Sequence, residues 1–173
     1  MINYVTGDAT EPIGDGPKII MHCCNDVGMW GKGFVLALSE KWPQAEKEYR
    51  AWFERGFCHN IDTGNATFHL GGVQLVDLEN DLYVANIIGQ RGIKIQTIGG
   101  QEFPPIRYEA LQEGFARVRV AAKELEASVH CPMLGCGLAG GKWSGGNGDT
   151  VSSLICEQLT SKGVDVTVYE YIK

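Results

Sequence analysis

Two segments of the chain share one plan: an apolar strand, a loop rich in glycine, and a helix. The first spans residues 18–42 and the second spans residues 128–160. Strands that lead through a loop into a helix are typical of α/β domains. In open α/β sheets, ligands bind beyond the carboxyl ends of the strands, where such loops lie. The pattern therefore predicts an α/β fold with a ligand site formed by these two loops.

The remainder of the chain predicts further strands and helices around this framework. The middle of the chain is typical of a β-meander, and residues 90–105 form a loop rich in glycine and proline. No repeat or low-complexity stretch interrupts the pattern, so we expect one domain of three layers. The expected strands are residues 1–5, 18–25, 63–71, 73–78, 82–89, 128–134 and 164–172, and the expected helices are residues 33–42, 44–56, 106–127 and 149–163.

The charge balance narrows the range of partners. The sequence carries 15 basic and 21 acidic residues, a net charge of −6, which argues against a long nucleic-acid groove or an anionic membrane surface. No apolar run approaches the roughly 20 residues that span a bilayer, and the chain begins with a strand pattern rather than a signal peptide. A small anionic ligand is compatible with this charge, because backbone N–H groups can bind phosphate.

The cysteines do not predict a metal centre. The sequence holds six of them without a CxxC pair, and the adjacent Cys23 and Cys24 point to opposite faces of a strand, where they make poor joint ligands. We expect free thiols in a reduced cytoplasmic protein that uses no metal and no cofactor.

Of the two loops that follow apolar strands, the second is especially rich in glycine. Residues 135–148 contain seven glycines in fourteen positions, and glycine allows backbone N–H groups to approach a phosphate closely. Neither loop is a P-loop, and "GCGLAG" (135–140) matches the dinucleotide motif by its letters alone, without the acidic residue expected further on. The loops therefore predict a phosphate-type pocket, with tight turns of purely structural importance as the alternative.

Five stretches together resemble a macrodomain. They are "YVTGDAT" (4–10), "MHCCNDVGMWGKGFVLAL" (21–38), "YVANIIGQ" (83–90), "PPIRYEAL" (104–111) and "PMLGCGLAGGKW" (132–143). The likeness is strongest to the branch of ADP-ribose-1″-phosphate phosphatases and their phage and bacterial relatives, and "WPQAEKEY" (42–49) adds to it. The resemblance implies a single macrodomain over residues 1–173, a three-layer α/β/α fold with a central mixed, mostly parallel sheet.

The resemblance also assigns positions to the ligand, ADP-ribose. Asp8 would accept a hydrogen bond from the adenine amino group, Ala9 would add a backbone contact, and Asn25 would hold the distal ribose. The family's loops around the distal ribose and diphosphate would be Gly31, Lys32, Gly33 and Phe34, together with Leu134, Gly135, Cys136, Gly137, Leu138, Ala139, Gly140 and Gly141.

For several of these positions a purely structural role is the alternative to ligand binding. Asp8 can simply cap a turn, Asn25 can close a strand end, and Lys32 can be a solvated charge. Trp30 stands in a loop between Met29 and Gly31. We expect it to cover the ligand, with a place in the core as the alternative.

His22 is the residue with the most chemical meaning, and we expect it to be catalytic together with Asn25. A neutral imidazole can give or take a proton near pH 7, and removal of a phosphate needs a protonated leaving group or an activated water. The phosphatase branch that the chain resembles carries a histidine at this strand position. The alternative is a buried strand histidine.

The predicted activity is hydrolysis of ADP-ribose 1″-phosphate to ADP-ribose and phosphate by a cytoplasmic monomer. Two alternatives remain: a reader that binds ADP-ribose without catalysis, and a hydrolase that removes ADP-ribose from protein or nucleic acid. One macrodomain branch removes ADP-ribose from modified glutamate side chains by means of a lysine and an aspartate. Here Gly89 or Gln90 and Ala139 stand at those positions, so that reaction is not expected. The expected partners are ADP-ribose or its 1″-phosphate.

Overall fold

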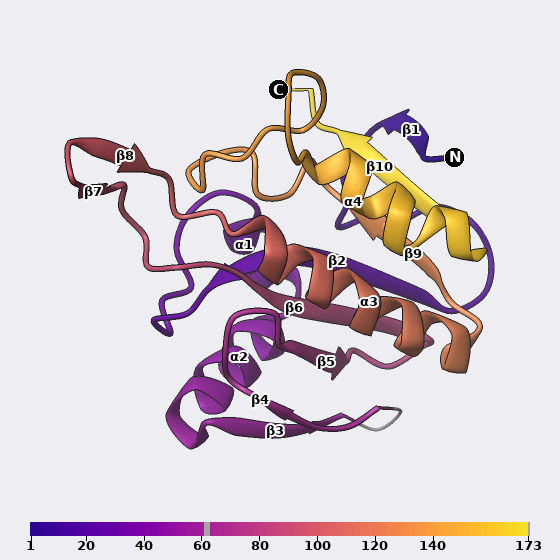
Figure 1. Cartoon of the computed structure of the whole chain (residues 1–173). Helices are drawn as coiled ribbons and strands as arrows, with labels where there is room; N and C mark the ends of the chain where they lie inside the picture. The colour runs from indigo at the N-terminus through magenta and orange to yellow at the C-terminus, as the bar shows by residue number, and fades with distance from the viewer. Residues whose placement is uncertain (61–62, 173) are drawn as a thin grey trace.

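A mixed sheet of six strands forms the centre of the computed structural model, which describes residues 1–60 and 63–172 (Figure 1). Its strands run parallel except for the edge strand β5, which is antiparallel to β6. The order across the sheet is β1 (Asn3–Thr6), β10 (Val166–Glu170), β9 (Ser128–Cys131), β2 (Lys18–Asn25), β6 (Leu82–Gln90) and β5 (Val73–Asp77). Since β9 pairs with β2, the two segments of the shared plan lie side by side.

Helices cover both faces of the sheet, as Figure 1 shows. Helices α1 (Phe34–Lys41) and α2 (Pro43–Arg55) pack on one face, and α3 (Tyr108–Leu125) and α4 (Val151–Gln158) pack on the other. This arrangement confirms the predicted three-layer fold with a mixed, mostly parallel sheet. No helix in the described part of the chain combines the length and the apolar character needed to cross a membrane.

The alternation of side chains along β2 divides the core into two clusters. Ile19 and Met21 belong to the cluster beneath α3 and α4, whereas Ile20 and Cys24 belong to the cluster beneath α1 and α2. Successive side chains of a strand point to opposite faces of the sheet. A strand that is apolar at both sets of positions must therefore be covered on both faces, which is the physical reason for three layers.

The ends of α2 and α4 follow from local sequence signals. Pro43 occupies the start of α2, where the missing N–H costs nothing, and Gly56 ends the helix in a left-handed conformation with φ of 81°. Thr150 and Ser153 form a capping box at the start of α4, in which each side chain bonds the backbone N–H of the other residue.

Three segments differ from the sequence-based expectation. Residues 57–60 form a strand that was not expected, β3 (Phe57–Asn60), which pairs with β4 (Gly64–Thr67), a strand shorter than predicted. The loop after β6 contains a small hairpin, β7 (Gln96–Ile98) and β8 (Gln101–Phe103), which projects from the body in Figure 1. The helix expected to reach residue 163 ends at Gln158, and a 3-10 turn follows (Thr160–Lys162). These short strands are mostly exposed and lack the apolar alternation by which a strand is recognised.

Candidate functional site

A cleft with two lobes lies beyond the carboxyl ends of the central strands. The first, which we name the glycine lobe, has a volume of about 330 Å³, and the second, the tyrosine lobe, has a volume of about 390 Å³. The lobes share Gly33, Phe34 and Pro132 and so form one cleft. The glycine lobe is lined by His22, Cys23, Lys32, Gly33, Phe34, Val35, Gln90, Pro132, Met133, Leu134, Gly135, Gly137, Leu138 and Ala139, and the tyrosine lobe by Asp8, Ala9, Gly33, Phe34, Ala37, Pro132, Tyr169 and Tyr171.

The glycine lobe is suited to an anion. Lys32 supplies a positive charge, and among the described residues that line the lobe none carries a carboxylate. A bulge in β2 between Cys24 and Asn25 places Asn25 opposite Gln90, so the β2–β6 ladder is distorted where it meets this lobe. Backbone N–H groups of glycine-rich loops are common anion donors. The lobe therefore offers charge and backbone dipoles without a repelling acidic group.

The second glycine loop has a fixed shape. Gly141 N–H donates to Gly135 O at 2.8 Å, and Ile106 N–H donates to Ala139 O at 3.0 Å. A Cβ atom at Gly141 would lie 2.5 Å from Gly135 O, and one at Gly140 would lie 2.7 Å from Pro104 Cβ. Close approach to the backbone of Gly135 is therefore the reason for glycine at position 141, whereas at position 140 the reasons are the left-handed φ of 77° and the close side chain of Pro104.

The tyrosine lobe combines a carboxylate with aromatic walls. Asp8 Oδ1 accepts hydrogen bonds from Thr10 N and Thr10 Oγ1, both at 2.8 Å, which orients the carboxylate. Within the described residues these bonds use Oδ1, so Oδ2 can accept from a ligand. The Tyr169 hydroxyl, Oη, accepts a hydrogen bond from Ile13 N at 2.9 Å and lies 2.7 Å from His130 Nδ1, and these two bonds hold the Tyr169 ring against the lobe. An aromatic wall beside a carboxylate suits a flat base that carries an amino group.

His22 lies beneath the glycine lobe in a polar network. Its Nε2 donates to Asn86 Oδ1, because Asn86 Nδ2 donates to Gln74 Oε1 at 3.0 Å and so turns the amide oxygen toward His22. The ring packs against Trp30 and Phe34 at centroid distances of 5.6 and 5.9 Å. Burial lowers the pKa of His22 to about 4, although the bond to Asn86 opposes the shift. The imidazole is therefore neutral at pH 7, with its hydrogen on Nε2.

Trp30 and Asn25 require a correction, because both side chains point into the protein. Trp30 is buried, packs against Tyr49 and donates from Nε1 to Val35 O at 2.9 Å, so it forms part of the core and not a cover over the cleft. Asn25 Oδ1 accepts from Val27 N, Met29 N and Tyr49 Oη, and Nδ2 donates to Met29 O. The amide therefore shapes the first loop and does not face the cleft as a ribose anchor. Both side chains find their polar partners inside the fold.

The structure brings most of the remaining expected residues to the cleft. The lining includes Asp8, Ala9, His22, Lys32, Gly33, Phe34, Leu134, Gly135, Gly137, Leu138 and Ala139. It does not include Gly31, Cys136, Gly140 or Gly141. Their places in the site stay predictions.

Sequence reasoning missed several cleft residues that the fold supplies, among them Gln90, Met133 and Tyr171. Gln90 ends β6, the strand beside β2, and its position at a carboxyl end is a signal that could have found it. Met133 follows β9, and Tyr171 follows β10 next to Tyr169. Tyr171 is 70% exposed and stands in the last residues of the chain, where the sequence carries no pattern that indicates a site.

The sheet order, the helices on both faces and the cleft at the carboxyl ends of the strands define a three-layer α/β domain with a cleft between two glycine loops. Comparison with known proteins identifies its family: the chain belongs to the macrodomain family. It is 48% identical to a macrodomain protein from Streptomyces coelicolor, with a TM-score of 0.78 and coverage of 98% of this chain and 99% of that one. It is 46% identical to a protein of unknown function from Bacteroides thetaiotaomicron, with a TM-score of 0.84 over 99% and 98% of the two chains.

Curated relatives match at lower identity. The chromodomain-helicase-DNA-binding protein 1-like of Danio rerio is 32% identical over 98% of this chain, but the chain spans only 16% of the length of that relative. The ADP-ribose 1″-phosphate phosphatase of Candida albicans is 38% identical over 61 residues, which are 34% of this chain and 36% of that protein. Thermosipho africanus DarTG in complex with ADP-ribose has the same fold, with 19% identity, a TM-score of 0.65 and coverage of 89% and 38%. No family model matches the chain.

Proposed function

We propose that the two-lobed cleft binds ADP-ribose. The observation that carries the proposal is the division of charge between the lobes: Asp8 lies in the tyrosine lobe and Lys32 in the glycine lobe. The adenine amino group would donate to Asp8 Oδ2 with the base against Tyr169. The diphosphate would then lie at the glycine loops near Lys32, where the lining holds no carboxylate among the described residues.

Calorimetry with ADP-ribose and its inosine analogue tests this orientation. The inosine analogue lacks the amino group, so we expect it to bind the native protein about tenfold more weakly, the value of one hydrogen bond to a charged acceptor. Asp8→Ala should remove this difference, because it should lower the affinity for ADP-ribose and leave the affinity for the inosine analogue unchanged. Asp15→Ala, which changes an acidic residue outside this cleft, is the matched control. Equal affinity of the native protein for both ligands would contradict the proposed adenine site.

Hydrolysis of ADP-ribose 1″-phosphate is the reaction that this cleft supports best. Water would add to phosphorus, the bond between phosphorus and the ribose oxygen would break, and that oxygen would take a proton. Lys32 favours a terminal phosphate in the glycine lobe, and the partial similarity to the Candida albicans phosphatase supports the same chemistry. Oriented dipoles and positioning would supply most of the rate.

Phosphate release from ADP-ribose 1″-phosphate separates the possible roles of the site. Lys32→Gln should reduce the rate of phosphate release by a larger factor than it reduces the affinity for ADP-ribose. At pH 7 a pKa of about 4 leaves about one His22 ring in a thousand protonated, so we expect His22→Gln to slow release less than about tenfold. A loss above a hundredfold at unchanged ADP-ribose affinity would instead make His22 the catalytic residue.

The outcome of the same assay on the native protein decides between an enzyme and a reader. Micromolar binding of ADP-ribose without phosphate release would leave a non-catalytic reader. A release of ADP-ribose from modified protein or nucleic acid, measured beside it, would favour the ADP-ribosyl hydrolase instead.

A further inference from the structure

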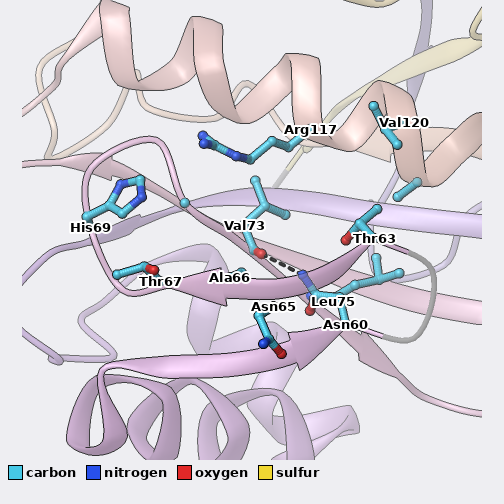
Figure 2. Close-up of a pocket in the computed structure, with 12 residues that line it drawn as sticks. Asn60, Thr63, Asn65, Ala66, Thr67, His69, Val73, Leu75, Arg117 and Val120 are labelled. Atoms are coloured by element: carbon cyan, nitrogen blue, oxygen red, sulfur yellow. Dashed lines mark hydrogen bonds between the residues drawn. The ribbon is translucent and has the colours of Figure 1, made fainter.

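A second pocket lies on the opposite side of the edge strand from the cleft. It has a volume of about 320 Å³ and is enclosed by the β3–β4 hairpin, strand β5 and the second half of α3 (Figure 2). It shares no residue with either lobe of the cleft within the described part of the chain. Its volume is at the lower end of the range for pockets that hold small molecules. We name it the hairpin pocket.

Among the described residues of the hairpin, a side chain and not a paired strand forms the link to the sheet, and this link leaves room for the pocket. Asn60 Nδ2 donates to Val73 O at 2.9 Å, and Asn60 Oδ1 accepts from Leu75 N at 2.8 Å. This carboxamide occupies the bonding positions on the edge of β5 that a peptide group of a neighbouring strand would use. A paired strand would lie about 4.8 Å from β5 and would leave no space. The side-chain link holds the hairpin further away and preforms a slot.

Two contacts limit how much of the β5 edge the slot leaves open, which restricts what it can hold. Asn60 occupies the bonding positions of Val73 O and Leu75 N. Gly72 packs so closely on the end of β4 and the turn after it that a Cβ atom there would lie 2.6 Å from Thr67 O and 3.0 Å from His69 O. An added strand must run through along an open edge, so an extended peptide does not fit here. A small molecule or the last residue of a chain does.

The lining combines one cation with an apolar wall. Arg117 extends from α3 over the pocket on the side of His69, opposite the hairpin strand, as Figure 2 shows. Val73, Val120 and Ala121 provide the apolar surface. Among the described residues that line the pocket none is acidic, and besides the imidazole of His69 the remaining polar groups are amides and hydroxyls, such as Asn65 and Thr67.

The hydrogen bonds of Arg117 hold its guanidinium at the pocket through one of its nitrogen atoms. Its Nη1 donates to Gly71 O at 2.6 Å and to Glu113 Oε2 at 3.2 Å. Nε and Nη2 make no hydrogen bond within the residues that the structure describes. Glu113 reduces the charge of Arg117, but both side chains are about half exposed, so this ion pair is weak and separates easily. A single arginine fork matches one planar carboxylate, whereas a phosphate dianion requires more donors.

We propose that the hairpin pocket binds a small organic carboxylate with a short aliphatic body. The carboxylate pairs with Arg117, and the aliphatic part packs against Val73 and Val120. A free carboxylic acid and the carboxyl end of a polypeptide with an aliphatic last residue share this chemistry. The site is independent of ADP-ribose binding in the cleft.

Titration of 3-methylbutanoate, followed by NMR of the methyl groups of Val73, Val120 and Ala121, tests the proposal. For a ligand of seven heavy atoms we expect saturable shifts with a Kd of about 1 mM. Its neutral amide, of the same shape, should not bind. N-acetyl-glycyl-valine tests the chain-terminal source, and the tighter of the two acids identifies the source. The absence of saturable shifts for both acids up to about 20 mM, or equal binding of the amide, overturns the proposal.

Three variants keep the test independent of folding. Arg117→Gln should weaken binding at least fivefold, and Val120→Phe should abolish it by filling the space. Glu113→Gln should strengthen binding two- to fivefold by restoring the charge of Arg117, a gain that a folding defect cannot produce. Arg50→Gln is the matched control, because Arg50 also pairs with a glutamate four residues earlier and bonds a glycine carbonyl, yet does not line the pocket. An unchanged Kd in both Arg117→Gln and Glu113→Gln would refute the assignment.

Discussion

Mild acid should destabilise the protein through its two buried histidines. His22 and His130 are each 2% exposed, and burial lowers the pKa of each to about 4. The unfolded chain takes up these protons near pH 6.5 and the folded chain only near pH 4. The stability that neutral histidine provides is therefore complete above pH 6.5 and is lost as the pH falls toward 4.

The size of the effect follows from the two pKa values. Between pH 7 and pH 5, a folded pKa of about 4 against an unfolded value of about 6.5 removes about 2 kcal/mol per histidine. The two together remove about 4 kcal/mol, a large share of the 5–15 kcal/mol that is usual for a domain. We expect His22→Gln to lose about half of this pH dependence, because glutamine can still donate to Asn86 but does not titrate.

Denaturant unfolding at pH 7 and pH 5, followed by tryptophan fluorescence, measures the difference. Each variant is compared with itself at the two pH values, so that a constant loss of stability cancels. His59→Gln is the control, since His59 is exposed on the hairpin, and it should retain the full effect. If the native protein and His22→Gln lose the same stability between the two pH values, the neutral, buried state of His22 is refuted.

Three further results are expected. Gly141→Ala should lower ADP-ribose affinity at least tenfold in calorimetry, because the methyl group would displace the second loop from Gly135 O. Asn25→Ala should lower the free energy of unfolding by about 2–4 kcal/mol in a denaturant titration, because several bonds within the first loop and to Tyr49 are lost. Two single variants, Tyr169→Phe and His130→Gln, should each weaken the binding of ADP-ribose but not the binding of ribose 5-phosphate. The double variant should bind ADP-ribose little more weakly than either single variant, because both changes break the same hydrogen bond.

The local pattern predicted the elements that carry a strong period or a clear cap. β2, α2 and α3 were found because their apolar positions repeat and because Pro43 and Gly56 mark the ends of a helix. The pattern does not predict β3, and it predicts β4 only as part of a longer strand over residues 63–71. These short strands pair with each other apart from the main sheet, and in the described part of the chain the side chain of Asn60 bonds them to β5. A hydrogen bond between a side chain and a distant strand does not change the spacing of apolar residues along the sequence, so that spacing cannot predict it.

The sequence by itself determined the family, the layers and the place of the cleft. Runs of apolar residues followed by glycine loops can be covered and connected in few ways, and these loops must meet where parallel strands end. Only the tertiary structure decided which side chains face the cleft. Asn25 and Trp30 belong to the predicted loop, yet they turn inward because Tyr49 and Val35, brought near by the fold, satisfy their polar atoms. Gln90 and Tyr171 reach the cleft because neighbouring strands end beside it. A local pattern specifies where a backbone runs, whereas the direction of a polar side chain depends on partners that are distant in the sequence.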